Sequence, residues 1–181
     1  KTKDSFTKVI NSHPIQLAAG KEYWWGINTK YSKSLQFGSS FKNESVVVNL
    51  DKSNEITWNT FGFSPYKWMR VDISSIYSTS ALKFNLKGTE IPKLQAVLFA
   101  YTGKNRRLQK ILNESNFIDR GNGTYEAFLP LKSLIGHSEF RWDALKEIRF
   151  KILEGTQFEI GNFQLIEFRG NPEKPTKWKG I

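Results

Sequence analysis

The sequence predicts an all-β fold, an antiparallel β-sandwich. Apolar and polar residues alternate with a period of two through most of the chain, and clusters of Gly, Asn, Ser and Pro separate these runs at short intervals. Aromatic residues make up 14% of the chain (14 Phe, 6 Tyr, 6 Trp), with a single Met, and such side chains fit a pleated sheet better than a helix. The 181 residues, 39% of them hydrophobic, suffice for one domain with its own core.

The expected strands follow one another closely along the chain. Two fainter ones are expected near residues 23–27 and 35–37. Nine clearer ones follow at residues 45–50, 55–60, 67–74, 81–86, 94–101, 108–113, 124–129, 148–153 and 158–168. Leu82, Phe84 and Leu86 alternate with polar residues, which indicates one buried face. Residues 94–101 are almost continuously apolar, which favours a central strand covered on both sides.

Few segments depart from this pattern. Asn122-Gly123 is the strongest tight-turn signal, because both residues tolerate a positive φ. Residues 142–147 predict one short helical turn, with Asp143 at its amino end. Residues 170–181 have a linker's composition, so we expect one sandwich domain over 1–169 and a tail leading to another module. The chain does not begin with Met and is expected to be a mature or excised piece of a longer, secreted or cell-surface protein.

Composition limits the functional classes. With no Cys, the chain has no disulfides, thiolate zinc sites or cysteine nucleophiles, and no run of about 20 apolar residues predicts a membrane span. Lys and Arg number 27 against 17 Asp and Glu, a net charge of +10 that suits an anionic partner or serves solubility alone. The terminal basic groups are interpreted as solvated flanks, so only residues 104–110 are expected to form a basic surface with a role.

Four segments carry a family resemblance: ALKFNL (81–86), LQAVLFAYTG (94–103), GTYEAFLPL (123–131) and IRFKILEGTQFEIGNFQLIEF (148–168). In this order they resemble strands of the galactose-binding-like jelly roll of carbohydrate-binding modules, including its closing hairpin. The resemblance implies a non-catalytic module that holds a polysaccharide on aromatic platforms, attached to a polysaccharide-degrading enzyme. It also implies a structural calcium near Asn162. The I-D-N-I centre of the family reads Ile-Gly-Asn-Phe here, which removes a carboxylate that calcium favours.

Sugar rings present a C–H face and a rim of hydroxyls, so exposed Trp and Tyr beside polar groups are the candidate platforms. Trp24 and Trp25 are neighbours in one strand and must face opposite sides of the sheet, one in the core and one accessible. Trp58 and Trp68 are either core or platform residues, with the core favoured for a large ring in a strand. Tyr66 follows Pro65 and is expected to be accessible at a strand entrance.

Residues 101–107 are the densest polar, basic and aromatic cluster. Tyr101, Asn105, Arg106 and Arg107 are expected in a hairpin loop, where an Arg fork can hold a carboxylate or sulfate. This pattern favours an acidic polysaccharide, sulfated or rich in uronic acid. The alternative is an ordinary basic hairpin of a basic protein.

The sequence contains no recognisable catalytic motif. The two histidines, His13 and His137, have no partner at metal-binding spacing, and no phosphate loop or G-x-S-x-G elbow is present. Carboxylates such as Glu126, Glu154 and Glu159 are interpreted as solvent-facing strand residues.

Two alternatives to a binding module stay open at this stage. One is a small polysaccharide lyase, which would use Tyr101 with Arg106 and Arg107. The other is a nucleic-acid-binding domain, suggested by charge and aromatic content together. It is disfavoured because the charge gathers at the ends and no nucleic-acid motif appears.

Overall fold

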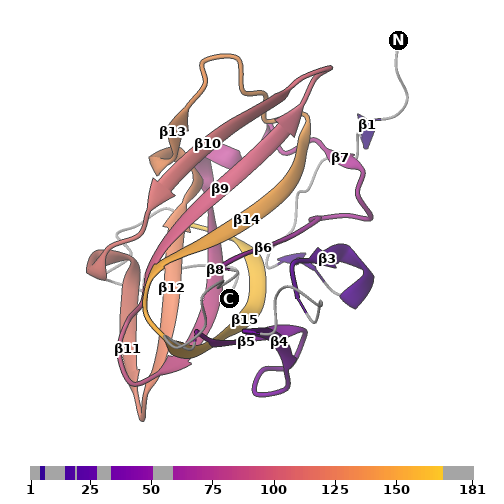
Figure 1. Cartoon of the computed structure of the whole chain (residues 1–181). Helices are drawn as coiled ribbons and strands as arrows, with labels where there is room; N and C mark the ends of the chain where they lie inside the picture. Colours follow the sequence, from indigo (N-terminus) through magenta and orange to yellow (C-terminus); the bar gives the residue numbers. More distant parts are fainter. Residues whose placement is uncertain (1–4, 7–14, 19, 28–33, 51–58, 169–181) are drawn as a thin grey trace.

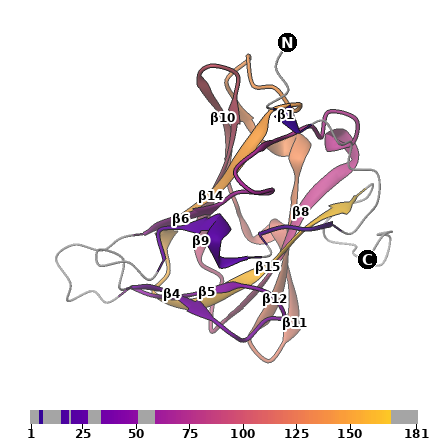
Figure 2. The same ribbon diagram turned by 90° about the vertical axis from the view of Figure 1, so that its right-hand side faces the viewer.

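The computed structural model describes residues 5–6, 15–18, 20–27, 34–50 and 59–168. They form two β-sheets packed face to face, a β-sandwich (Figure 1), and Figure 2 shows the two layers from the side. The predicted all-β sandwich is confirmed. Short 3-10 turns are the only helical elements in this part of the chain, at Lys21–Tyr23, Tyr77–Thr79, Glu114–Asn116 and Leu131–Ser133. None of them has the length and apolar character needed to cross a membrane.

Sheet A has eight strands and carries the candidate site. Its main path runs β1-β7-β14-β9-β10-β13, and β6 pairs with β14 on one side and β3 on the other. The strands are β1 (Ser5–Phe6), β3 (Trp24–Trp25), β6 (Thr60–Phe63), β7 (Arg70–Val71), β9 (Lys93–Tyr101), β10 (Asn105–Ile111), β13 (Ile135–Gly136) and β14 (Leu145–Glu154). All pairs are antiparallel except the short β1–β7 contact.

Sheet B has seven strands in the order β11-β12-β8-β15-β5-β4, with β2 paired to β15. They are β2 (Ile15–Gln16), β4 (Leu35–Gly38), β5 (Ser45–Asn49), β8 (Ser80–Gly88), β11 (Phe117–Gly121), β12 (Thr124–Pro130) and β15 (Gln157–Glu167). The predicted Asn122-Gly123 turn joins β11 to β12, with φ of 57° and 74°. Positive φ at both positions is what a two-residue type I′ hairpin requires.

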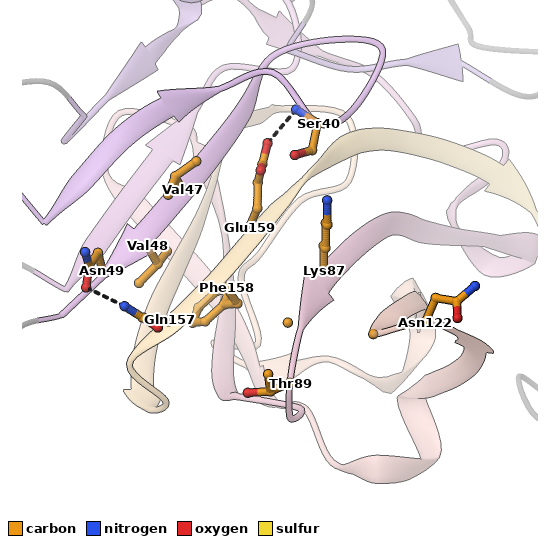
Figure 3. Close-up of a pocket in the computed structure, with 12 residues that line it drawn as sticks. Ser40, Val47, Val48, Asn49, Lys87, Thr89, Asn122, Gln157, Phe158 and Glu159 are labelled. Carbon is orange, nitrogen blue, oxygen red and sulfur yellow. Dashed lines mark hydrogen bonds between the residues drawn. The ribbon is translucent and has the colours of Figure 1, made fainter.

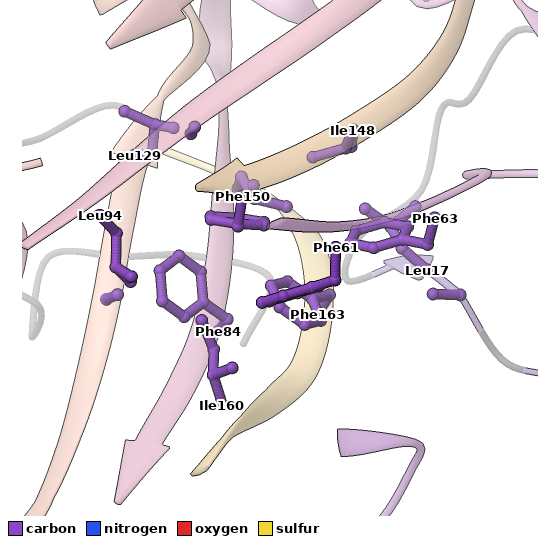
Figure 4. Packing of buried hydrophobic residues seen from close by; sticks show 14 of the residues in the cluster. Leu17, Phe61, Phe63, Phe84, Leu94, Leu129, Ile148, Phe150, Ile160 and Phe163 are labelled. Carbon is purple, nitrogen blue, oxygen red and sulfur yellow. The ribbon is translucent and has the colours of Figure 1, made fainter. Parts of the chain in front are cut away.

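The core lies between the sheets and is rich in phenylalanine (Figure 4). Phe163 of β15 lies at its centre, with ring centroids 4.9 Å from Phe63, 5.3 Å from Phe84 and 5.3 Å from Phe150. Each fully buried ring contributes roughly 1.5–3 kcal/mol through the hydrophobic effect. Because inward positions are filled by these apolar residues, alternation along each strand leaves the polar residues on the outer faces.

Most clear strand predictions are confirmed, and two local predictions are wrong. Residues 67–74 contain only the two-residue β7, because Lys67 and Trp68 adopt positive φ of 46° and 60°, which an extended strand does not allow. The helical turn predicted at 142–147 is absent, since β14 already begins at Leu145. Trp58, much of the strand predicted at 55–60 and the tail from 170 lie outside the described residues.

Candidate functional site

An aromatic and charged surface lies on the outer face of sheet A. β3, β6, β14 and β9 are consecutive neighbours there, and the register of the ladders brings their outward side chains together. We call this set the platform face; it consists of Trp25, Gly62, Phe99, Tyr101, Glu147 and Arg149.

Trp25 is held flat at the edge of the platform face. It lies opposite Gly62 in the β3–β6 ladder, and a β-carbon at residue 62 would come within 2.6 Å of the indole nitrogen of Trp25. Only glycine therefore leaves room for the ring over the strand. The indole N–H donates a hydrogen bond to the carboxylate of Glu147 on β14. The ring is thus positioned from beneath and at its edge, while its side chain remains only half-buried.

Arg149 connects Trp25 to a second ring. Its Nε and Nη2 donate to the two carboxylate oxygens of Glu147 at 3.1 and 3.2 Å. The guanidinium carbon lies 5.0 Å from the ring centroid of Trp25 and 4.1 Å from that of Phe99. These are cation–π distances, and the bidentate pair with Glu147 fixes the guanidinium plane. Nη1 donates to none of the described residues, so it is free to meet a ligand.

Basic groups surround Tyr101 and Phe99. Tyr101 is 37% exposed, and the ammonium group of Lys146 lies 5.0 Å from its ring centroid. Arg107 is opposite Phe99 in the β9–β10 ladder and is exposed, without an ion pair to any described residue. Among the described residues here, the cations Lys146, Arg107 and Arg149 outnumber the acid Glu147, so this part of the surface is positive.

A loop with left-handed backbone extends the aromatic surface. Residues 64–69 connect β6 to β7, which both pair with β14, so the loop lies at the same edge of sheet A as β3, the strand of Trp25. The buried Ser64 Oγ accepts hydrogen bonds from the backbone N–H of Tyr66 at 3.2 Å and of Trp68 at 2.6 Å. Tyr66 is 37% and Trp68 38% exposed, and the Trp68 indole N–H donates to the Glu22 carbonyl at 3.2 Å. Left-handed φ at two consecutive non-glycine residues is strained backbone, which concentrates at functional sites.

The structure decides which of the paired tryptophans faces the core. Trp24 is 8% exposed, packs on Phe61 and Phe63, and donates its indole N–H to the Ala18 carbonyl at 3.2 Å. Trp25 is its accessible neighbour. The ligand-binding prediction for Trp24 is therefore wrong, because its ring fills the space between the sheets.

Residues 101–107, predicted as a basic ligand-binding hairpin loop, present only some of the predicted side chains to solvent. Tyr101, Asn105 and Arg107 are exposed, but Arg106 is engaged by Glu139 in an ion pair of 3.0 Å. The cluster of Tyr101, Arg106 and Arg107 that a lyase would need is not brought together as one constellation, because Arg106 and Arg107 alternate across β10.

Sequence reasoning missed Gly62, Phe99, Glu147 and Arg149. The apolar run 94–101 signalled Phe99 but was interpreted as a strand covered on both sides, which is wrong. Phe99 is only half-buried and Tyr101 is exposed, because the outer half of β9 contributes to the platform face. Trp68, for which the core was favoured, is exposed because the left-handed turn carries it off the sheet.

The residues around Asn162 do not fit a calcium ion. Its amide donates to Asn85 Oδ1 at 2.8 Å, and its strand neighbours Gly161 and Ser45 carry no carboxylate. Calcium takes six to eight oxygen ligands, usually with carboxylates among them. No group of three or more His, Cys, Asp or Glu suited to a metal occurs in the described ranges.

Comparison with known proteins identifies the family. The family model of carbohydrate binding domain 30 matches residues 22–167. The chain belongs to this family. It is a carbohydrate-binding module, and the match spans both sheets and every residue of the platform face. No curated protein sequence matches the chain significantly.

Solved structures agree with this assignment at the level of the fold. The family 30 module of the cellulosomal cellulase Cel9D-Cel44B of Clostridium thermocellum is 12% identical, with a TM-score of 0.55 over 90% of this chain and 97% of that one. A family 11 module from Clostridium thermocellum, solved with a β-1,3-1,4-mixed-linked tetrasaccharide, is 12% identical, with a TM-score of 0.53 over 88% of this chain and 98% of that one. At such low identity these likenesses establish the sandwich and not the ligand.

Proposed function

We propose that this family 30 module binds an acidic polysaccharide across the platform face and keeps an attached enzyme at that substrate. The observation that carries the proposal is the fixed ring of Trp25, held over Gly62 and bonded to Glu147. A ring positioned before binding loses little conformational entropy when a sugar stacks on it. Phe99 and Tyr101 continue the surface across β9, and Tyr66 and Trp68 continue it at the sheet edge.

The polar groups around these rings suit the hydroxyls and acid groups of a glycan. Nη1 of Arg149 can donate to a ligand lying over Trp25 and Phe99. Arg107 and Lys146 add two exposed or half-exposed cations near Phe99 and Tyr101. Charge-assisted hydrogen bonds to carboxylate or sulfate are about twice as strong as those between neutral groups. An acidic glycan would therefore gain more from this surface than a neutral one.

A neutral β-glucan is the second candidate ligand. The family 11 structure contains a mixed-linked tetrasaccharide, and the similar family 30 module comes from a cellulase. Stacking on Trp25, Trp68 and Tyr101 requires no charge on the ligand, so the same surface would serve such a chain.

Targeting and secretion are part of the same proposal. The similar modules in Clostridium thermocellum are parts of cellulosomal cellulases, which supports an enzyme joined to this module outside the cell. Joining two binding units raises the effective concentration of one near the ligand of the other, so even a weak glycan site would hold the enzyme at its substrate.

Affinity electrophoresis through gels containing different polysaccharides tests the proposal. The panel contains neutral mixed-linked glucan and xyloglucan, a polyuronate and a sulfated galactan, with DNA as a competitor. We expect retardation in the acidic gels that exceeds retardation in the neutral ones and is not relieved by DNA. Equal or greater retardation in neutral gels would replace the acidic ligand with the neutral one, and no retardation in any gel would reject glycan binding at this surface.

A further inference from the structure

A hollow lies on the outer face of sheet B (Figure 3). The platform face belongs to the other sheet, so the two lie on opposite sides of the sandwich. Its volume is about 460 Å³, enough for one or two sugar rings, and its polar lining includes Ser40, Lys87, Thr89, Asn122, Gln157 and Glu159. Nothing in the binding scheme for the platform face uses these residues.

The floor of the hollow is one row across three strands. Glu159 of β15 pairs with Val47 of β5 on one side and with Lys87 of β8 on the other. The adjacent residues Ile160 and Leu86 are fully buried, so alternation turns Glu159 and Lys87 outward. Figure 3 shows the two charged side chains next to each other beneath the loop that carries Ser40.

The negative charge of Glu159 and the positive charge of Lys87 cancel in the floor of the hollow. The Glu159 carboxylate accepts hydrogen bonds from the Ser40 N–H at 2.9 Å and the Ser45 hydroxyl at 2.5 Å, which hold it in place although it is only 9% exposed. Lys87 is exposed, and its ammonium group makes no hydrogen bond or ion pair with the described residues. One positive and one negative group side by side favour a neutral ligand whose hydroxyls can both donate and accept.

The rim of the hollow carries polar side chains that form no hydrogen bond, or only a weak one, with the described residues. Asn122 is exposed at the tip of the β11–β12 hairpin, and Thr89 is exposed just after β8. The Asn122 amide and the Thr89 hydroxyl form no hydrogen bond within the part of the chain that the structure describes. On the other side, the Gln157 amide donates to Asn49 Oδ1 at 3.4 Å, a weak contact that a ligand can replace.

We propose that this hollow is a second saccharide site, which takes a single neutral sugar unit or the end of a neutral chain. Among the described residues, no Trp or Tyr lines it, and its aromatic residue, Phe158, is only 5% exposed. An extended chain therefore has no open ring to stack on, and recognition rests on hydrogen bonds. With sites on opposite faces, one module can hold two glycan chains at once. Loss of the Lys87 donor removes a hydrogen bond to a charged group and weakens this site by about tenfold or more.

Amide chemical shifts recorded during titration with neutral disaccharides test the proposal. The titrants are cellobiose, xylobiose and mannobiose at millimolar concentration, each added to the wild-type chain and to Trp25→Ala. We expect saturable shifts at the amides of Lys87, Thr89 and Asn122 for at least one sugar, with the same Kd in both proteins. Lys87→Met should raise that Kd by about tenfold, and Lys132→Met, at another exposed lysine, should leave it unchanged.

The outcomes separate this site from the platform face. Shifts confined to the platform face, or none with any of the three sugars, overturn the second site, whatever the platform face binds. An unchanged Kd for the shifts around Lys87 in Lys87→Met also overturns it. If the platform face fails to bind glycan while the Lys87 region titrates as expected, the second site stands alone.

Discussion

The indole N–H of Trp25 bonds to the carboxylate of Glu147, a residue 122 positions later in the chain and two strands away across sheet A. The same carboxylate holds the guanidinium group of Arg149 through two hydrogen bonds. One acidic side chain therefore sets both the orientation of an aromatic platform and the position of a cation. The stacking and electrostatic parts of ligand binding are coupled through Glu147.

Glu147→Gln separates these two parts. The amide oxygen of Gln still accepts the hydrogen bond of Trp25, but the negative charge beside Arg149 is lost. Because a charge at about 4 Å in water is worth about 1 kcal/mol, we expect affinity for an acidic polysaccharide to rise roughly fivefold. Affinity for neutral glucan should change by less than about twofold. Calorimetric titration of both ligands measures this, and weaker binding of the acidic ligand would contradict the role given to Arg149.

Gly62→Ala displaces the ring of Trp25. The new β-carbon would lie 2.6 Å from the indole nitrogen, so the ring must leave its place over β6. We expect glycan affinity to fall by about tenfold, since the ring loses its fixed orientation. Thr60→Ala is the matched control, because Thr60 is on the same strand and bonds to Asn59 Oδ1 at 3.1 Å. Equal affinities of the two variants would show that the ring's position does not matter.

Salt dependence identifies the cations that meet an acidic ligand. Exposed charges are screened over about 10 Å at 0.1 M salt, so binding of an acidic polysaccharide should weaken as salt rises, while binding of a neutral one should not. Arg107→Gln and Lys146→Gln should each make the salt dependence shallower. Lys132→Gln, a control outside sheet A, should keep the wild-type slope. An unchanged slope in both platform variants would place the acidic ligand elsewhere.

Glu159 gives the fold a specific acid sensitivity. Burial raises the pKa of Glu159, but hydrogen bonds from Ser40 and Ser45 and the charge of Lys87 lower it by more, so the pKa lies below its usual value of 4.5. Its ionised form therefore stabilises the folded state above pH 4.5, and this contribution is lost as pH falls through the lower, folded-state pKa. Urea unfolding of Glu159→Gln should show a smaller loss of stability below pH 4.5 than wild type. Parallel curves would contradict this linkage.

Much of the fold could be predicted from the sequence, because strands and tight turns are determined largely by residues that are neighbours in the chain. Alternation located β8, β12 and β15, and the Asn122-Gly123 pair located a hairpin with the required positive φ. The patterns failed at Lys67 and Trp68, where alternation in residues 67–74 resembles a strand but the Ser64 hydroxyl stabilises a left-handed turn. That hydrogen bond depends on backbone geometry that no residue spacing reveals.

The site was harder to predict than the fold because its contacts are long-range. Adjacent tryptophans predicted one buried and one accessible ring, but only the pairing of β3 with β6 decides that Trp24 faces Phe63 and Trp25 faces outward. Gly62, Glu147 and Arg149 come from strands far apart in sequence, and each alone is an ordinary strand residue. Arg106 and Arg107 looked equivalent in sequence, yet Glu139 engages only one of them.

The most direct test of glycan binding at the platform face is the affinity of Trp25→Ala for the polysaccharide that most retards the wild-type chain. Trp25 is half-buried, so the variant should keep a cooperative unfolding transition in urea, which serves as the control for folding. We expect Trp25→Ala to bind at least about tenfold more weakly than wild type, because an aromatic platform has been removed. A folded Trp25→Ala variant with wild-type affinity would contradict it.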